Sequence, residues 1–232
     1  MQKNTKYNGW ELQSFDNAEN FRKYQLEKIR KYIKNKKILD VGSGSGGLIK
    51  YYQMETRNIS IFEPSKNLYN KIKKKFKNSK INYFNNKNKI KQKYDSILYM
   101  DVIEHIKDYE NEINFILKKI KKKGFLIINV PAFNFLYTDF DKSVGHIKRF
   151  TKKDFYYLSK KFNLKIKKLE YYDSIGFILI FLSKYLLAFY LKTRNVSTNV
   201  KIWNYLIPLS KKIDKILYNQ IGKSLICVLE KK

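Results

Sequence analysis

The sequence contains almost no cysteine. Cys227 is the only one among 232 residues, so no disulfide can form within the chain. Residues 1–8 are polar and lack the apolar core of a secretory signal. Both features favour a reducing compartment, and we expect a cytoplasmic protein.

Acidic residues and arginine are also scarce. The chain has 49 Lys and Arg against 20 Asp and Glu, and its formal net charge of +29 would ordinarily indicate nucleic acid or an anionic membrane as partner. The arginines, which are the side chains best suited to bidentate phosphate contacts, are Arg22, Arg30, Arg57, Arg149 and Arg194. Because lysines are spread along every predicted helix, we interpret them as solvated faces and expect no dedicated nucleic-acid binding.

The chain also lacks an apolar run long enough to cross a bilayer. Residues 175–191 are apolar on nearly all sides of a predicted helix, yet a helix of this length reaches roughly 25 Å against a hydrocarbon core of ~30 Å. Lys184 at its centre disfavours a spanning helix further. We therefore expect a helix over residues 174–191 that is buried or lies at a membrane interface. With a second apolar run it forms a predicted insertion, residues 174–213, within a single domain of residues 1–232.

What the sequence does have is a short apolar strand that leads directly into a glycine cluster, KILDVGSGSGG at residues 37–47. Glycine is needed where the backbone turns with positive φ or approaches a ligand closely. A helix predicted at residues 48–52 would direct its free N–H groups to the same point. The pattern predicts a cofactor loop, with contacts expected from Asp40, Gly42, Ser43, Gly44 and Gly46.

Strands and helices are predicted to alternate with short connections. An amphipathic helix at residues 17–34 precedes the first strand. Further strands are predicted at residues 58–62, 81–84, 94–100, 125–130, 164–171 and 224–230. Helices are predicted between them, one starting at the N-cap Ser65 and ending at 77, one ending at 121 before a turn at 122–124, and one starting at Thr151 and ending at 161. The order predicts a doubly wound, mostly parallel seven-stranded α/β sheet with ligands at the carboxyl ends of its strands.

Glu63 ends the second predicted strand, about twenty residues after the glycines. An acidic side chain there can accept hydrogen bonds from both ribose hydroxyls of an adenosine cofactor. The alternative is a surface glutamate before a turn. The spacing of Gly42, Gly44 and Gly47 also fits the G-x-G-x-x-G pattern of dinucleotide-binding folds, so an NAD(P)-dependent oxidoreductase remains an alternative.

Asp40, two residues before the first glycine, makes residues 38–46 resemble the first motif of class I S-adenosylmethionine (SAM) dependent methyltransferases. The hexapeptide DVIEHI at 101–106 resembles the segment that follows the fourth strand in this family. Residues 131–154 are similar to a subgroup of bacterial class I enzymes, many encoded near cell-surface glycan or lipid enzymes. The resemblance implies a Rossmann-like methyltransferase fold with the last strand antiparallel at the sheet edge. It also implies SAM as cofactor, with Asn86 and Asp101 beside it.

The same resemblance implies a small-molecule, glycan or lipid-linked acceptor that enters at the loop after the fifth strand. Candidate acceptor contacts there are Tyr137, Asp139, His146 and Arg149. A hydroxyl acceptor needs a base, and the chain has two histidines, His105 and His146. We take His146 as the candidate base and Asp101 as a second catalytic candidate. The alternative is that His146 only fixes the loop and Arg149 pairs with an aspartate.

Asp101, Glu104 and His105 are also similar to the E-V-x-E-H segment of ubiquinone-pathway O-methyltransferases, in which such residues hold a divalent metal. Asp replaces Glu at the first position, and two carboxylates with one imidazole are a thin site for a hard cation. We expect no metal and keep these three residues as the alternative.

The favoured function is SAM-dependent methyl transfer, with oxygen as the expected acceptor atom. Asp40 and the absence of a recognisable hydride-transfer Tyr/Lys pair disfavour the oxidoreductase. A membrane- or nucleic-acid-binding module is a third, more distant alternative. We also expect the segment 175–209 to cover the acceptor side and, through its flanking lysines, to touch an anionic membrane surface. The alternative is a helix buried against the sheet or in a homodimer interface.

Overall fold

The computed structural model describes residues 9–185 and 196–232. The polar segment 1–8 and the end of the predicted apolar helix, residues 186–191, lie outside the described residues. A seven-stranded sheet has the strand order β3-β2-β1-β4-β5-β7-β6. Its strands are β1 Ile38–Val41, β2 Ile59–Phe62, β3 Ile81–Phe84, β4 Tyr94–Met100, β5 Ile120–Pro131, β6 Leu164–Tyr172 and β7 Ser224–Lys231.

Strands β3, β2, β1, β4 and β5 are parallel to their neighbours, as the alternating pattern predicts. The strand order changes direction between β1 and β4: β2 and β3 follow on the side of β1, and β5 follows on the side of β4. In doubly wound sheets the ligand lies outside the carboxyl ends of the strands at this switch point. The glycine loop follows β1 there, so the fold places the predicted cofactor loop where a ligand is expected.

The position of the last strand corrects one expectation. β7 is antiparallel, but it lies between β5 and β6, so β6 is the edge strand. Residues 225–229 of β7 form a continuous apolar run that is fully buried, which suits a strand covered on both faces and both sides. β6 intersperses lysines with apolar residues and is only partly buried, as an edge strand can be.

Two local boundaries also differ from the prediction. Helix α5, Tyr109–Leu117, ends before residue 121 because the chain already enters the sheet, where the amide of Tyr94 donates to the carbonyl of Lys119. The predicted turn at 122–124 belongs to β5, with Lys123 at a φ of 60°. Ser65 stands at the N-cap of α4, but its side chain makes no capping hydrogen bond.

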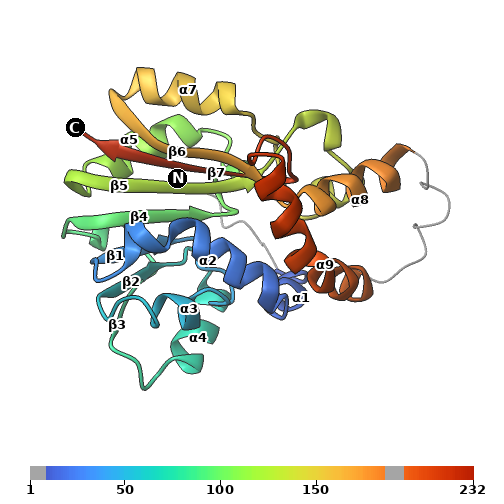
Figure 1. Cartoon of the computed structure of the whole chain (residues 1–232). Helices are drawn as coiled ribbons and strands as arrows, with labels where there is room; N and C mark the ends of the chain where they lie inside the picture. The colour runs from blue at the N-terminus through green and yellow to red at the C-terminus, as the bar shows by residue number, and fades with distance from the viewer. Residues whose placement is uncertain (1–8, 186–195) are drawn as a thin grey trace.

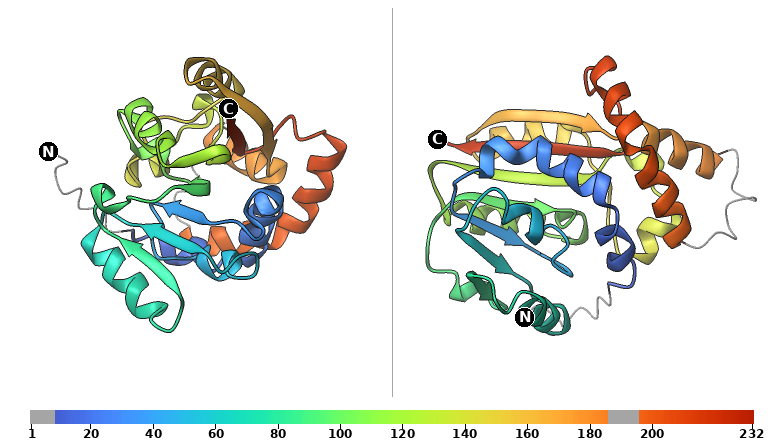
Figure 2. Two further views of the ribbon diagram at one scale, coloured as in Figure 1. Left: turned by 90° about the vertical axis from the view of Figure 1, so that its left-hand side faces the viewer. Right: turned by 60° about the horizontal axis from the view of Figure 1, so that its bottom comes forward.

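Helices cover both faces of the sheet (Figures 1 and 2). One apolar core joins β1 and β2 to α2 Glu19–Ile33, α3 Ile49–Tyr52, α4 Lys66–Lys75 and α9 Val196–Ile216. The other joins the opposite face to α5 and to α7 Lys152–Lys161, where Thr151, expected to begin the helix, forms a capping box with Asp154. Short helices α1 Leu12–Asp16 and α6 Asp139–Ser143 lie at the carboxyl ends of the strands, and α1 has no counterpart among the predicted elements.

Helices α8 Ser174–Tyr185 and α9 connect β6 to β7 and project beyond the carboxyl end of the sheet (Figures 1 and 2). The structure therefore has helices between these two strands, as predicted. That they belong to one domain with the rest of the chain stays a prediction. Ser174 and Gly176 are the fully buried residues of α8, and its large apolar side chains are half-buried or exposed. Within the described part of the chain, no helix combines the length and apolarity that crossing a membrane requires.

Candidate functional site

The glycine loop turns through left-handed backbone at the end of β1. Gly42 and Gly44 have φ values of 69° and 58°, a region that side-chain-bearing residues rarely adopt. The amide of Gly42 donates to the carbonyl of Phe62, which ties the loop to β2 at 2.7 Å. The loop is therefore built as the sequence predicts, with backbone rather than side chains facing the end of the sheet.

Glu63 lies beside this loop at the end of β2. One carboxylate oxygen accepts from the amide of Gly44 at 2.8 Å, and the other accepts from the amide of Ser65 at 2.9 Å. The residue is 4% exposed, so it is not a surface glutamate, and burial raises its pKa. Each oxygen keeps a second lone pair, which is what ribose hydroxyls would need.

Asp40 lies under the loop rather than in it. Its carboxylate is buried, and the hydroxyl of Tyr52 lies 3.5 Å from one oxygen. Burial raises the pKa of Asp40 to about 7, although the hydrogen bond from Ser43 opposes the shift. Asp40 thus lies at the end of β1 with Tyr52 and Ser43 beside its carboxylate, and its contact with the cofactor stays a prediction.

Asp101 follows β4 with a φ of 59°, a strained backbone for a non-glycine residue. Its carboxylate accepts from Asn129 Nδ2 at 2.6 Å and from Gln25 Nε2 at 3.3 Å. Asn129 in turn accepts from the hydroxyl of Tyr172 at 2.7 Å. Sequence reasoning did not include Gln25 or Asn129, because their amides reach Asp101 only through the packing of α2 and β5 against β4.

Asn86 lies at the end of β3, but it is exposed and its side chain accepts from the amide of Asn88 at 2.9 Å. No hydrogen bond in the described structure joins it to the glycine loop. Its contact with adenine stays a prediction.

His146 and Arg149 meet on the carboxylate of Asp141. Nδ1 of His146 lies 2.7 Å from Oδ1, and the guanidinium of Arg149 donates to both oxygens at 3.0 and 2.9 Å. Burial alone would raise the pKa of Asp141, but the hydrogen bonds from His146 and Arg149 lower it, so the carboxylate is ionised. Arg149 is thus paired with an aspartate, whereas the role of His146 as a base stays a prediction. The Nδ1 side of the His146 ring is therefore occupied by Asp141, and Nε2 is the nitrogen that points away from this pair.

Glu104 faces this histidine from the turn η2, Ile103–His105. Its Oε1 lies 3.9 Å from Nε2 of His146, and the residue is 1% exposed. Among the described residues neither of its side-chain oxygens has a hydrogen-bond partner, and burial raises its pKa well above the usual range. A buried carboxylate left in this state is costly, which indicates a group that a ligand completes.

The ring of His105 lies 4.7 Å from that of His146. Its Nδ1 lies 3.2 Å from the carbonyl of Gly145, and burial lowers the pKa of His105 to about 4. Glu104, His105 and His146 each offer a ligand atom within 4.8 Å of the others, so they could hold a metal ion. The structure thus gathers His146, not Asp101, with the other two candidates of the sequence.

Tyr137 supports this cluster, while Asp139 stands apart from it. The hydroxyl of Tyr137 donates to the carbonyl of His146 at 2.7 Å, which fixes the histidine's backbone. Asp139 is exposed in the first turn of α6. Their contact with an acceptor stays a prediction.

Several acidic side chains are buried at this end of the sheet, among them Asp40, Glu63, Glu104, Asp141 and Asp173, with Asp101 partly buried beside them. Asp141 is paired with Arg149, and Asp173 is paired with Lys223. Burial raises the pKa of Asp40, Glu63 and Glu104, so these groups do not carry their full formal charge at the strand ends.

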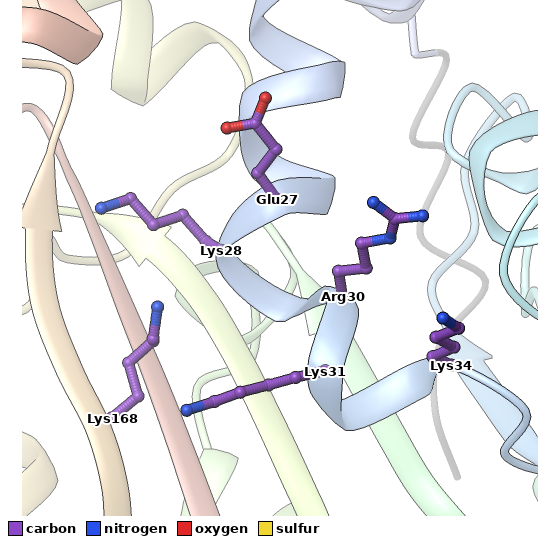
Figure 3. A pocket seen from close by; sticks show the side chains of 6 residues that line it. All are labelled: Glu27, Lys28, Arg30, Lys31, Lys34 and Lys168. Atoms are coloured by element: carbon purple, nitrogen blue, oxygen red, sulfur yellow. The ribbon is translucent and has the colours of Figure 1, made fainter.

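The described cavities do not coincide with this site. One hollow of about 520 Å³ lies between α2 and β6 and is lined mostly by cations (Figure 3). These lining residues are Glu27, Lys28, Arg30, Lys31, Lys34 and Lys168. The glycine loop is instead covered by α1: Leu12 lies against Gly44, and Ser45 donates to Asp16 at 2.5 Å. The site is therefore located by the switch point of the sheet and not by this hollow.

The fold and the strand-end site define a Rossmann-like enzyme of the methyltransferase class. Residues 15–169 match the family model described as "Methyltransferase domain", and the chain belongs to this family. The family assignment confirms the predicted class and sets the oxidoreductase alternative aside. SAM is the methyl donor that this assignment supports.

Curated relatives match over part of the chain. Ubiquinone biosynthesis O-methyltransferase from Rickettsia bellii is 29% identical over an alignment of 116 residues, and the match covers 46% of this chain and 48% of that protein. The chain therefore spans about half the length of the curated relatives it matches.

Solved structures share the fold at low identity. Phosphoethanolamine N-methyltransferase 2 of Haemonchus contortus, in complex with SAM, is 15% identical with a TM-score of 0.60 and 91% and 52% of the two chains covered. N-methyltransferase NodS from Bradyrhizobium japonicum, in complex with S-adenosylhomocysteine, is 10% identical with a TM-score of 0.58 and 92% and 87% covered. These likenesses confirm the Rossmann-like methyltransferase fold predicted from the sequence.

Proposed function

We propose that this protein transfers the methyl group of SAM to a hydroxyl oxygen of a small-molecule, glycan or lipid-linked acceptor. The observation that carries the proposal is the arrangement of His146, whose Nδ1 is held by ionised Asp141 while Nε2 faces buried Glu104. A hydroxyl needs a base to become a nucleophile at neutral pH, and this imidazole has its acceptor nitrogen directed into the site.

When bound, SAM supplies a methyl group on a positively charged sulfur. Methyl transfer would join the acceptor oxygen to the methyl carbon as the carbon–sulfur bond breaks, and the electron pair would stay on sulfur to give S-adenosylhomocysteine. His146 would take the hydroxyl proton on Nε2, and Asp141 would stabilise the resulting imidazolium through Nδ1. The glycine loop and Glu63 would hold the adenosine end.

The relatives support this proposal without deciding it. The curated relative from Rickettsia bellii is an O-methyltransferase by its name. An amine acceptor is the second candidate, because the unpaired buried carboxylate of Glu104 would suit a cationic ammonium group.

An acceptor screen with methyl-labelled SAM tests the proposal. Alcohols, phenols and polyprenyl-linked sugars are compared with amines of matching carbon skeleton, and labelled products are identified by mass spectrometry. Labelled ethers or esters formed with release of S-adenosylhomocysteine support O-methylation. Label found only on nitrogen overturns the oxygen assignment in favour of the second candidate. Calorimetric titration with SAM and NAD(H) checks the donor separately.

A further inference from the structure

Two helices at the carboxyl end of the sheet keep large apolar side chains in solvent. We call α8 and α9, residues 174–185 and 196–216, the α8–α9 projection. On α8 the exposed fractions are 48% for Ile178, 40% for Phe181 and 50% for Tyr185. On α9 they are 47% for Ile202, 81% for Tyr205 and 51% for Leu209. Apolar exposure of this extent on adjoining elements marks an interaction surface.

The exposed residues are arranged as faces, not as isolated positions. Ile202, Tyr205 and Leu209 follow one another at spacings of three and four, so they share one side of α9. The buried residues of α9 lie on its other side, at Val200, Trp203, Ile207, Ser210 and Asp214. On α8, Ile178, Phe181 and Tyr185 repeat the same spacing, and the rings of Phe181 and Tyr185 lie 4.9 Å apart.

The base of the α8–α9 projection is held firmly. Asp173 and Asp214 are both fully buried. Asp173 accepts from the indole of Trp203 at 2.7 Å and from the amide of Gly176 at 2.9 Å. Asp214 accepts from the hydroxyl of Tyr24 at 2.8 Å and from the amide of Ser174 at 2.8 Å. Hydrogen bonds to buried charges are strong, so the outward direction of the two helices is built into the fold.

The charge around these faces is positive. Between residues 174 and 216 the sequence contains seven lysines and arginines but a single acidic residue, Asp214, which is buried. Lys201, Lys212 and Lys215 are exposed beside the apolar face of α9. A second copy of this chain would bring like charges together, whereas anionic lipid headgroups neutralise them. The exposed tyrosines also suit an interface that is apolar on one side and wet on the other.

We propose that the α8–α9 projection docks on the surface of a membrane containing anionic lipids, with its apolar faces among the headgroups and its lysines on the lipid phosphates. The inference rests on the proposed function, because docking brings the membrane to the acceptor loop. Nζ of Lys184 on α8 donates to the carbonyl of Tyr137 at 2.7 Å, and the Tyr137 hydroxyl donates to the carbonyl of His146 at 2.7 Å. A lipid-linked acceptor would reach the site from this side.

Co-sedimentation of the full chain with vesicles tests the docking. Vesicles of phosphatidylcholine alone are compared with vesicles that also contain phosphatidylglycerol, at low and high salt. We expect binding only with phosphatidylglycerol, and weaker binding at high salt. The double variant Ile178→Gln/Phe181→Gln should lower the partition coefficient roughly tenfold or more, because two anchoring side chains are lost. Lys201→Gln/Lys212→Gln/Lys215→Gln should weaken binding and reduce its salt dependence.

Matched controls keep the outcome specific. Met54→Gln and Tyr156→Gln change residues that are 74% and 59% exposed on other elements and should leave binding within about twofold, since surface substitutions elsewhere act weakly. Lys73→Gln/Lys74→Gln on α4 removes charge without touching the projection. Equal binding to both vesicle types, no binding to either, or full binding by the Ile178/Phe181 variant overturns the proposal. A concentration-dependent dimer lost in that variant, without vesicle binding, assigns the surface to a second copy and overturns it too.

The docking proposal and the proposed function can fail independently of each other. SAM affinity, measured by calorimetry without vesicles, should be the same in the Ile178/Phe181 variant and the parent chain, since neither residue lies at the strand-end site. Vesicle binding by a protein that does not bind SAM would support docking and contradict the proposed function. SAM binding and O-methylation without any vesicle binding would support the proposed function and contradict docking.

Discussion

Leu12 of α1 lies against Gly44 of the glycine loop: its Cδ1 is 3.3 Å from the point that a Cβ on Gly44 would occupy. Phe15 and Trp10, on and just before the same short helix, contact the ring of Phe140 on α6. The N-terminal segment thus covers the cofactor loop from the side opposite the sheet. SAM binding must therefore displace Leu12 or fit beneath it, which bears on the first prediction.

Gly44→Val should abolish SAM binding while the protein remains folded. The added side chain meets Leu12 and enters the space over the loop, and φ at this position is 58°. Calorimetry with SAM, alongside circular dichroism, measures both effects. Gly145→Ala is the matched control, because Gly145 has a φ of 84° but nothing nearer than 3.7 Å around its Cβ position. A folded Gly44→Val variant with parental affinity would remove the loop from the cofactor site.

Glu63→Ala should weaken SAM binding by roughly 1.5 to 3 kcal/mol, the usual worth of hydrogen bonds to a charged group. The carboxylate also holds the amides of Gly44 and Ser65, so some loss of stability is expected as well. Glu55→Ala is the control: Glu55 is a buried glutamate away from the loop that pairs with Arg30 at 2.8 Å. If both variants lose stability alike and keep SAM affinity, Glu63 has a structural role only.

His146→Ala should lower kcat by ~10² or more and leave SAM affinity intact, as expected for loss of a general base. Steady-state kinetics with an acceptor from the screen measures this. Tyr137→Phe removes the hydrogen bond to the His146 carbonyl but keeps the imidazole, and it should have the smaller effect. A change confined to the KM of the acceptor would make His146 a binding residue.

Asp40 should make stability fall as pH rises through the weakly acidic range. Its pKa is about 7 in the folded protein against 3.8 for the free side chain, so between these values the folded state binds more protons than the unfolded state. Folding is then favoured at low pH, and the advantage is lost by about pH 7. Asp40→Asn should remove a difference on the order of 4 kcal/mol between about pH 4 and pH 8. Urea unfolding of both proteins across this range measures it; parallel pH profiles would contradict the expectation.

Chelation should leave methyl transfer unchanged. Glu104, His105 and His146 lie close enough to share an ion, and two imidazoles with one carboxylate are a donor set that zinc accepts; a bound ion would, however, occupy Nε2 of His146, which the proposed function needs as the proton acceptor. Activity is measured after dialysis against EDTA, with Glu104→Gln as the companion variant. Loss of activity restored by a divalent ion, together with loss of binding of that ion in Glu104→Gln, would make His146 a metal ligand rather than a base.

The α/β order and the cofactor loop were predictable because their signals are local. A strand that leads into glycines, and strands that alternate with amphipathic helices, leave a parallel sheet with ligands at its carboxyl end. Glu63 and Asp101 could be placed at that end for the same reason, since each directly follows a predicted strand. The boundaries of α5 and β5 were missed because β5 already pairs with β4 at Ile120, so that residues 121–124 form an irregularity within the strand and not a turn before it.

Contacts between distant residues were decided only by the tertiary structure. His146 and Glu104 are far apart in the sequence, and the loop after β5 brings them together through a hydrogen bond from the amide of Ile147 to the carbonyl of Glu104. Three further features depend on distant residues in the same way. Leu12 covers Gly44, and the amides of Gln25 and Asn129 donate to Asp101. Strand β7 lies between β5 and β6.

The apolar helix shows the division most clearly. By itself the sequence predicted an apolar helix over residues 174–191 between the last two strands, because that pattern is carried by neighbouring residues, and residues 174–185 of it are described as helix. Whether its side chains pack on the sheet or remain in solvent depends on which faces other helices already cover and on the direction in which buried Asp173 and Asp214 hold the helix base. These contacts join residues that are far apart in the sequence, so only the tertiary structure determines them.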